Sequence, residues 1–158
     1  MRAGRTLAAS GLCLIVAMGL AAWARPVLPD EPTDPSLALS ARSAVPARVT
    51  ATLRQACFDC HSNETRWPWY ARLPVASHLI ARDVREGRAQ LDWSAWETYS
   101  RFDRAELLDK ACERVSRGVM PPWQYRLLHP DARLSTSDVD ELCAWSRREA
   151  DRLAQGGS

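Results

Sequence analysis

The chain has 158 residues, 25% of them charged, and a formal net charge of +2 at pH 7. Its surplus positive charge comes from Arg2 and Arg5, because the residues after position 24 hold 19 basic and 19 acidic side chains. This balance leaves no basic stripe of the kind that nucleic-acid binding needs, and the length suits one small domain and not two. We therefore expect no nucleic-acid partner.

Residues 1–24 predict a signal peptide or an N-terminal membrane anchor. Arg2 and Arg5 form a basic n-region, an apolar run follows from Leu7 to Ala24, and Ala22-Trp23-Ala24 fits a small-x-small cleavage site. About 18 apolar residues also approach the length of a membrane span, so an uncleaved inner-membrane tether through residues 7–24 stays open beside cleavage. Both alternatives place the rest of the chain in the periplasm.

Residues 25–46 predict an extended linker. From Pro26 to Pro46 the sequence is rich in Pro, Asp, Ser and Ala, and it has no aromatic residue and little periodicity. The linker is expected to hold a single domain, residues 47–153, away from the membrane. That domain shows helix signals and no convincing strand alternation, which predicts an all-α fold.

Four helices are predicted in this domain, each from local start and stop signals. The first covers Arg48–Ala56, and the second covers Val75–Glu86, after Pro74 and before a stop at Gly87. Capping boxes are expected at Ser94 with Glu97 and at Asp103 with Glu106. Asp103 starts a third helix that Gly118 closes, with an apolar stripe of Leu107, Leu108, Ala111 and Val115, and a fourth runs from Ser135 or Ser137 to about Leu153.

The most specific motif is Cys57-Phe58-Asp59-Cys60-His61. A CxxCH sequence is the attachment signature of c-type haem: two thiols add to the haem vinyl groups, and the adjacent imidazole ligates the iron. A thioredoxin-like redox pair would need a βαβ setting, for which the sequence gives no sign. A zinc site would need four close ligands, whereas Cys112, Cys143, His78 and His129 are scattered.

Cys112 and Cys143 are the two cysteines left after the motif and the N-terminal segment are set aside. In an oxidising compartment they predict a disulfide that joins the last helix to its predecessor. The alternative is two separate buried thiols, since a free cysteine packs as a small hydrophobic residue.

Met120 is the leading candidate for a distal iron ligand. It follows Gly118 at a helix end and precedes Pro121-Pro122, which would stiffen the loop that presents it. His129 is the main rival, and His78 lies on a predicted helix where an ordinary histidine is the simpler interpretation. Met120 could also pack near the haem without ligating it.

Beyond the pentapeptide, the chain resembles a known family, the small bacterial haem-binding domain related to class I c-type cytochromes. The similarity covers roughly Ala51 to Trp145. Its motifs are CxxCH followed by Ser62-Asn63, Trp67-Pro68-Trp69-Tyr70, Met120-Pro121-Pro122, Tyr125 and His129-Pro130.

The resemblance implies a cytochrome c-like helical domain wrapped around one covalently attached haem. Carried over to this chain, Cys57 and Cys60 would attach the haem, with His61 as proximal and Met120 as distal ligand. Four aromatic residues would line the pocket, although plain core packing is the alternative for each: Trp67, Trp69, Tyr70 and Tyr125.

The sequence thus predicts a periplasmic mono-haem c-type cytochrome that transfers electrons between unidentified redox protein partners and is not an enzyme. The alternative is a haem enzyme or sensor, with an open or labile distal position for peroxide or a small gas. In that case His129 and a few arginine residues are the available acid-base groups, and their spacing singles out none of them.

Overall fold

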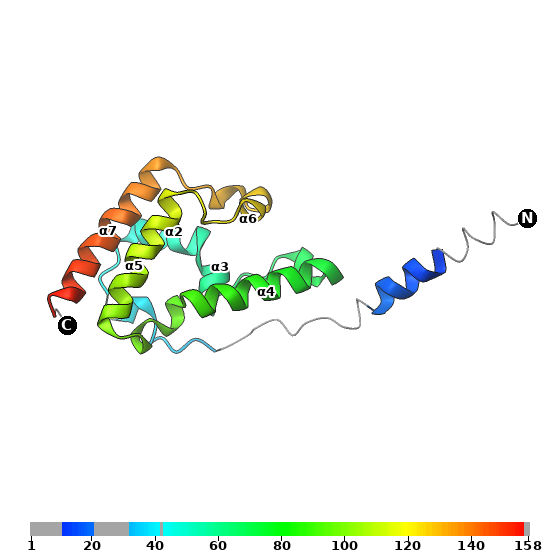
Figure 1. The fold of residues 1–158 in the computed structure, drawn as a ribbon, viewed down its shortest axis with the longest axis horizontal. Helices are drawn as coiled ribbons and strands as arrows, with labels where there is room; N and C mark the ends of the chain where they lie inside the picture. Colours follow the sequence, from blue (N-terminus) through cyan, green and yellow to red (C-terminus); the bar gives the residue numbers. More distant parts are fainter. Residues whose placement is uncertain (1–10, 21–31, 42, 157–158) are drawn as a thin grey trace, which may run out of the picture.

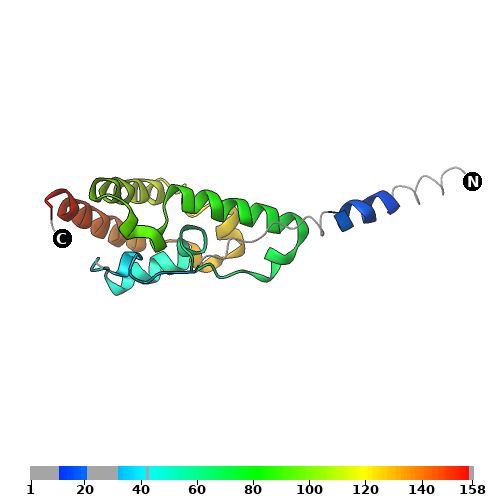
Figure 2. The ribbon, with the colours of Figure 1, turned by 90° about the horizontal axis from the view of Figure 1, so that it is seen from below.

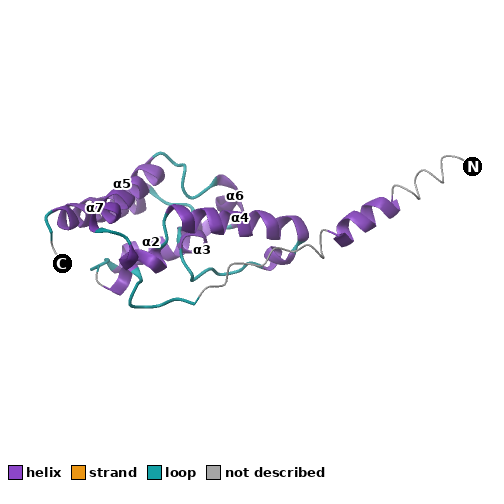
Figure 3. Cartoon of the chain, turned by 60° about the horizontal axis from the view of Figure 1, so that its bottom comes forward, coloured by secondary structure: helices purple, strands orange, loops and turns teal. Residues whose placement is uncertain are grey.

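The computed structural model describes residues 11–20, 32–41 and 43–156, and within these ranges every regular element is a helix (Figures 1 and 3). The predicted all-α fold is confirmed. The elements are η1 (Leu39–Ala41), α2 (Ala47–Ala56), α3 (Phe58–His61), η2 (Trp69–Arg72), α4 (Pro74–Gln90), η3 (Trp93–Thr98), α5 (Arg101–Ser116), α6 (Trp123–Leu128), η4 (Pro130–Ala132) and α7 (Thr136–Ala154).

Residues 11–20, part of the predicted N-terminal signal or anchor, are helical, and the rest of that segment lies outside the described residues. Among the helices of the described ranges, none combines the length and the apolar character that crossing a membrane requires.

Helices α5 and α7 run antiparallel and side by side, and they form the frame of the domain (Figures 1 and 2). The predicted stripe of α5 faces this contact, with Leu108 and Val115 buried and Leu107 and Ala111 partly buried. Cys112 of α5 and Cys143 of α7 form a disulfide across it. The hydrophobic stripe and the covalent bond therefore hold the same two helices together.

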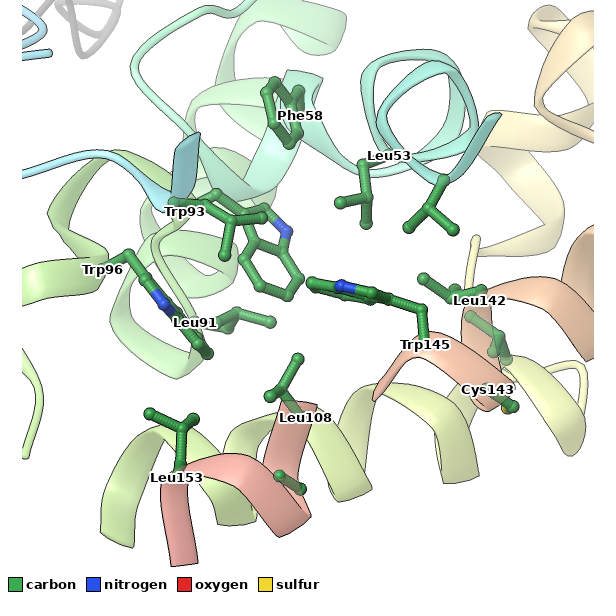
Figure 4. Close-up of a cluster of buried hydrophobic side chains, with 14 residues drawn as sticks. Leu53, Phe58, Leu91, Trp93, Trp96, Leu108, Leu142, Cys143, Trp145 and Leu153 are labelled. Carbon is green, nitrogen blue, oxygen red and sulfur yellow. The ribbon is translucent and has the colours of Figure 1, made fainter. Parts of the chain in front are cut away.

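Three tryptophans centre the core beside this frame (Figure 4). Trp93 and Trp96 come from η3 and Trp145 from α7, and each is at most 3% exposed. Leu53 of α2 and Phe58 of α3 pack into the same cluster. Phe58 is one of the two variable residues of the CxxCH motif, so its side chain packs the motif directly into the core.

Two predicted capping boxes are wrong. Asp92 caps η3 by accepting a hydrogen bond from the Ser94 N–H (2.8 Å), so Ser94 lies inside the element that it was expected to start. Helix α5 is capped by Ser100, whose hydroxyl accepts from the Asp103 N–H (3.2 Å). The observed caps therefore lie two residues before the predicted Ser94 and three residues before the predicted Asp103. In both places the extended backbone ends, and the helix begins, before the predicted capping residue.

The final helix begins as predicted, with Ser135 at the cap and a reciprocal capping box to Asp138. The predicted end of the second helix is wrong, since α4 continues through Gly87 to Gln90. Gly87 has no positive φ angle, so it does not terminate the helix.

The predicted linker does not stay apart from the domain. Leu39 is 3% exposed and belongs to the core, and the Glu97 N–H donates to the Leu37 carbonyl (2.9 Å). The Ser43 hydroxyl donates to the buried Glu149 carboxylate (2.8 Å). The domain therefore begins near residue 37, and position 47 marks only the start of α2.

Replacing Leu39 with alanine is expected to lower the free energy of unfolding by about 2–4 kcal/mol, because it leaves a cavity in the core. Leu37 is 37% exposed and takes part through its backbone, so Leu37→Ala is a matched control with an expected change of about 0.5 kcal/mol or less. Urea unfolding of the haem-loaded protein measures both. If neither variant changed the free energy of unfolding, the segment would be a linker and not part of the core.

Candidate functional site

The CxxCH motif forms a single helical turn directly after α2. The N–H groups of Cys60 and His61 both donate to the Cys57 carbonyl, at 3.2 and 2.9 Å. Residues three apart on a helix lie on the same face, so this turn places the Cys57 and Cys60 thiols side by side with the imidazole next to them. All three predicted attachment and ligand residues thus share helix α3 and its cap.

The His61 ring is held in one tautomer by the segment that follows α4. Its Nδ1 lies 2.9 Å from the Leu91 carbonyl oxygen. A carbonyl can only accept, so Nδ1 carries the hydrogen and donates it, which leaves the lone pair of the neutral ring on Nε2. Burial lowers the pKa of His61 and favours this neutral form. A neutral imidazole with a free Nε2 is the form that ligates iron.

The two thiols are neither bonded to each other nor activated. Cys57 and Cys60 are free and partly buried, and burial raises the pKa of Cys57 to about 12 and that of Cys60 to about 11. Redox-active CxxC pairs have lowered thiol pKa values, so this environment does not match a thioredoxin-like pair. Within the described ranges, no group of three or more His, Cys, Asp or Glu side chains is placed to hold a metal ion.

Gly87 allows α4 to pack closely on the motif. A Cβ atom at position 87 would collide with the Cys60 carbonyl oxygen, which is a backbone atom and cannot swing aside. The absence of a side chain therefore brings α4 against α3, and α4 in turn places Leu91 where it accepts from His61.

Asp59, the other variable residue of the motif, anchors two segments. Its carboxylate is 6% exposed and accepts from the Arg66 N–H (3.0 Å) and the Arg66 Nε–H (3.2 Å), which fastens the loop after the motif. It also accepts from the Tyr125 hydroxyl on α6 (2.6 Å). One buried carboxylate thus joins the proximal turn to the segment that carries the predicted distal residues.

Tyr70, Tyr125 and His129 form an aromatic cluster next to this carboxylate. The Tyr70 hydroxyl lies 2.5 Å from His129 Nε2, and the Tyr125 ring stacks on His129 with centroids 4.2 Å apart. Burial raises the pKa of both tyrosines, and Cys60 is close enough to add to each shift. The structure therefore brings two of the four predicted pocket aromatics to the motif.

The other two predicted aromatics lie outside this cluster. Trp69 is 76% exposed and touches Tyr70 edge to face. Trp67 lines a neighbouring cavity of about 690 Å³ between α2, the loop at Arg66 and the segment around Pro130. Its lining includes none of the motif cysteines, His61 or Met120, so the cavity adjoins the site and is not the site itself.

Met120 follows a tight turn at the end of α5. Gly118 has a φ angle of +67°, and two hydrogen bonds complete a Schellman motif: Gly118 N–H to the Val115 carbonyl and Val119 N–H to the Arg114 carbonyl, both 3.0 Å. Met120 comes next, partly buried against the same core that Cys57 contacts. Met120 therefore lies in the loop that follows this turn, with its side chain packed against the core.

His129 is less suited to ligation than His61, because its Nε2 is already paired with the Tyr70 hydroxyl. His78 is exposed on α4, with Nδ1 bonded to the Pro74 carbonyl (2.7 Å). Among the three histidines, His61 alone shares a helical turn with the two thiols.

The segments beside the motif expose an unusual amount of apolar surface. On η2 and the first half of α4 and on the loop and helix after α5, large apolar side chains are between 42% and 76% exposed: Trp69, Leu73, Val75, Leu79, Val119, Trp123, Leu127 and Leu128. The Tyr70–His129 contact joins these two segments. Apolar surface of this extent marks a binding site, and a porphyrin has the apolar faces to cover it.

A haem fits the residues present. Two unbonded thiols on one turn can form thioethers, His61 offers Nε2, and Met120 offers a soft sulfur from a separate loop. The sequence did not reveal three contributors. The Leu91 carbonyl is a backbone group with no sequence signal. Gly87 carries the signal of a helix stop, and Asp59 occupies a variable position of the motif, where the residue type alone indicates no role.

Comparison with known proteins supports haem binding. A family model described as a haem-binding domain matches residues 16–148. No curated protein and no solved structure gave a match.

Proposed function

Because the chain belongs to the haem-binding domain family, we propose that it is a periplasmic mono-haem c-type cytochrome that passes single electrons between redox protein partners. The observation that carries this proposal is the α3 turn, where a neutral His61 with Nε2 available stands beside two unbonded thiols. The export signature in residues 1–24 supports a periplasmic location, where c-type haem is attached.

In this proposal Cys57 and Cys60 hold the haem through thioether bonds, His61 is the proximal ligand and Met120 the distal one. When bound, haem supplies one-electron chemistry at its iron, and the axial ligands set the potential. The chain contributes the ring orientation of His61 through the Leu91 carbonyl, which also makes the imidazole a better donor. The tryptophan core next to the motif keeps water away from this side.

We propose electron transfer rather than catalysis because the histidine that directly follows α6 is already hydrogen-bonded. A peroxide-reducing or gas-binding site needs a proton donor near the bound oxygen. His129 is the best candidate for that role, and its Nε2 is engaged by the Tyr70 hydroxyl. The electron donor and acceptor are expected to be proteins.

The absorption spectrum of the purified protein in both oxidation states tests this proposal. We expect a low-spin c-type spectrum with a weak band near about 695 nm in the oxidised form, the marker of methionine bound to iron. A high-spin oxidised spectrum without that band, together with immediate binding of cyanide, would favour the open-site alternative.

A further inference from the structure

The segment from Gly118 to Leu128 is called here the distal segment, and its second half, helix α6, has little packing of its own. Its helix α6 contains no buried residue, and Trp123, Leu127 and Leu128 are each more than half exposed. Burial of apolar side chains is the main force that holds a helix on a domain, so α6 needs another attachment. At its start, the segment is fixed by the Schellman motif of Gly118.

The hydrogen bond from Tyr125 to Asp59 supplies an attachment at the other end. The hydroxyl donates to Asp59 Oδ2 at 2.6 Å, a short distance typical of a bond to a charged acceptor. The acceptor is rigid, since Asp59 is buried within the α3 turn and its carboxylate also accepts from the backbone N–H of residue 66 at 3.0 Å, a contact that does not depend on the side chain at that position. The Tyr125 ring is also immobilised by its stacking on His129.

We propose that the Tyr125–Asp59 hydrogen bond is a latch that fastens the distal segment, and with it Met120, to the CxxCH turn. This inference deepens the proposed function and rests on it for its consequence, the stability of the distal ligand. Tyr125 is then a positioning residue: it acts on the iron site through the loop that carries Met120.

Opening of the distal segment requires that this bond be broken. If Met120 ligates the haem iron, its exchange for an external ligand would need the same movement of the loop that carries Met120. Local opening has its own free energy, which the latch raises without changing the global stability of the α5–α7 frame. Removing the latch should therefore accelerate opening of residues 119–128 and leave α7 unchanged.

Tyr125→Phe removes the hydroxyl and keeps the ring, so it deletes the latch and preserves the stacking. In the haem-loaded protein, we expect amide hydrogen exchange of residues 119–128 to become about tenfold faster, with no change in residues 136–154. Arg66→Gln is the matched control, because it removes a donor to the same carboxylate from a residue outside the distal segment. It should change exchange of residues 119–128 by less than about twofold.

A second measurement follows imidazole binding to the oxidised protein, which should be about tenfold faster in Tyr125→Phe than in wild type and in Arg66→Gln. Any of three results would overturn the proposed latch. Exchange could be equal in Tyr125→Phe and wild type, it could accelerate uniformly and include α7, or it could accelerate to the same extent in Arg66→Gln. The ratio of exchange rates between Tyr125→Phe and wild type is taken in the same ligation state, so it reports the contribution of the latch whichever group ligates the iron. A wild-type spectrum without the methionine band would therefore contradict the proposed function. The exchange rates would still test separately whether the Tyr125–Asp59 hydrogen bond fastens the distal segment.

Discussion

Replacing both Cys57 and Cys60 with alanine should abolish covalent haem attachment, so that acid and organic solvent extract all of the haem from the variant. The two thiols lie on one face of the α3 turn and are free, whereas Cys112 and Cys143 are bonded to each other. Pyridine haemochrome spectra of the extracted protein measure the effect. A single variant, Cys60→Ala, should retain one thioether and show a shifted haemochrome band.

The second cysteine pair provides the matched control. The double variant Cys112→Ala/Cys143→Ala should keep its haem covalently bound, but its free energy of unfolding should fall by about 3–4 kcal/mol, the loop-closure value for a crosslink with a sequence separation of 31. If haem were retained after extraction without Cys57 and Cys60, or lost without Cys112 and Cys143, the assignment of the two pairs would be wrong.

Replacing Met120 with leucine should lower the midpoint potential by on the order of 0.1 V and open a position for CO or cyanide. Leucine keeps the apolar volume that Met120 packs against the core and removes only the sulfur. The substitution therefore separates ligation from packing. Redox titration and CO-difference spectra of the haem-loaded variant measure the two effects.

The comparison of Met120→Leu with Met120→Ala sharpens this test. If Met120 is the distal ligand, both variants should bind CO, and only the alanine variant should lose appreciable stability through its cavity. A leucine variant with an unchanged potential and no CO binding would mean that Met120 only packs, and His129→Ala would then become the variant to examine.

Local signals predicted the helices that depend on local physics. Asp103 and Gly118 place the ends of α5, and Ser135 or Ser137 places the start of α7, within two residues of the observed bounds. The CxxCH motif likewise forms one turn, as the proposed haem chemistry requires. In each case the interactions join residues only a few positions apart, which a sequence displays directly.

Apart from the two capping boxes, the errors concern residues whose role depends on distant partners. A glycine that ends a helix and one that admits a neighbouring backbone look the same in sequence, and Gly87 proved to be the second kind. Leu39 lies in a proline-rich stretch with little periodicity, and only the finished core shows that it is buried whereas Leu37 is not. The Leu91 carbonyl fixes the tautomer of His61. The sequence cannot single it out, because every residue has a backbone carbonyl.

The intact mass of the mature protein, produced in a host that attaches c-type haem, tests the central claim most directly. We predict a red protein whose denatured polypeptide is heavier than the bare chain by the mass of one haem, carried on the peptide that contains Cys57 and Cys60. A colourless product at the mass of the bare chain would contradict the account.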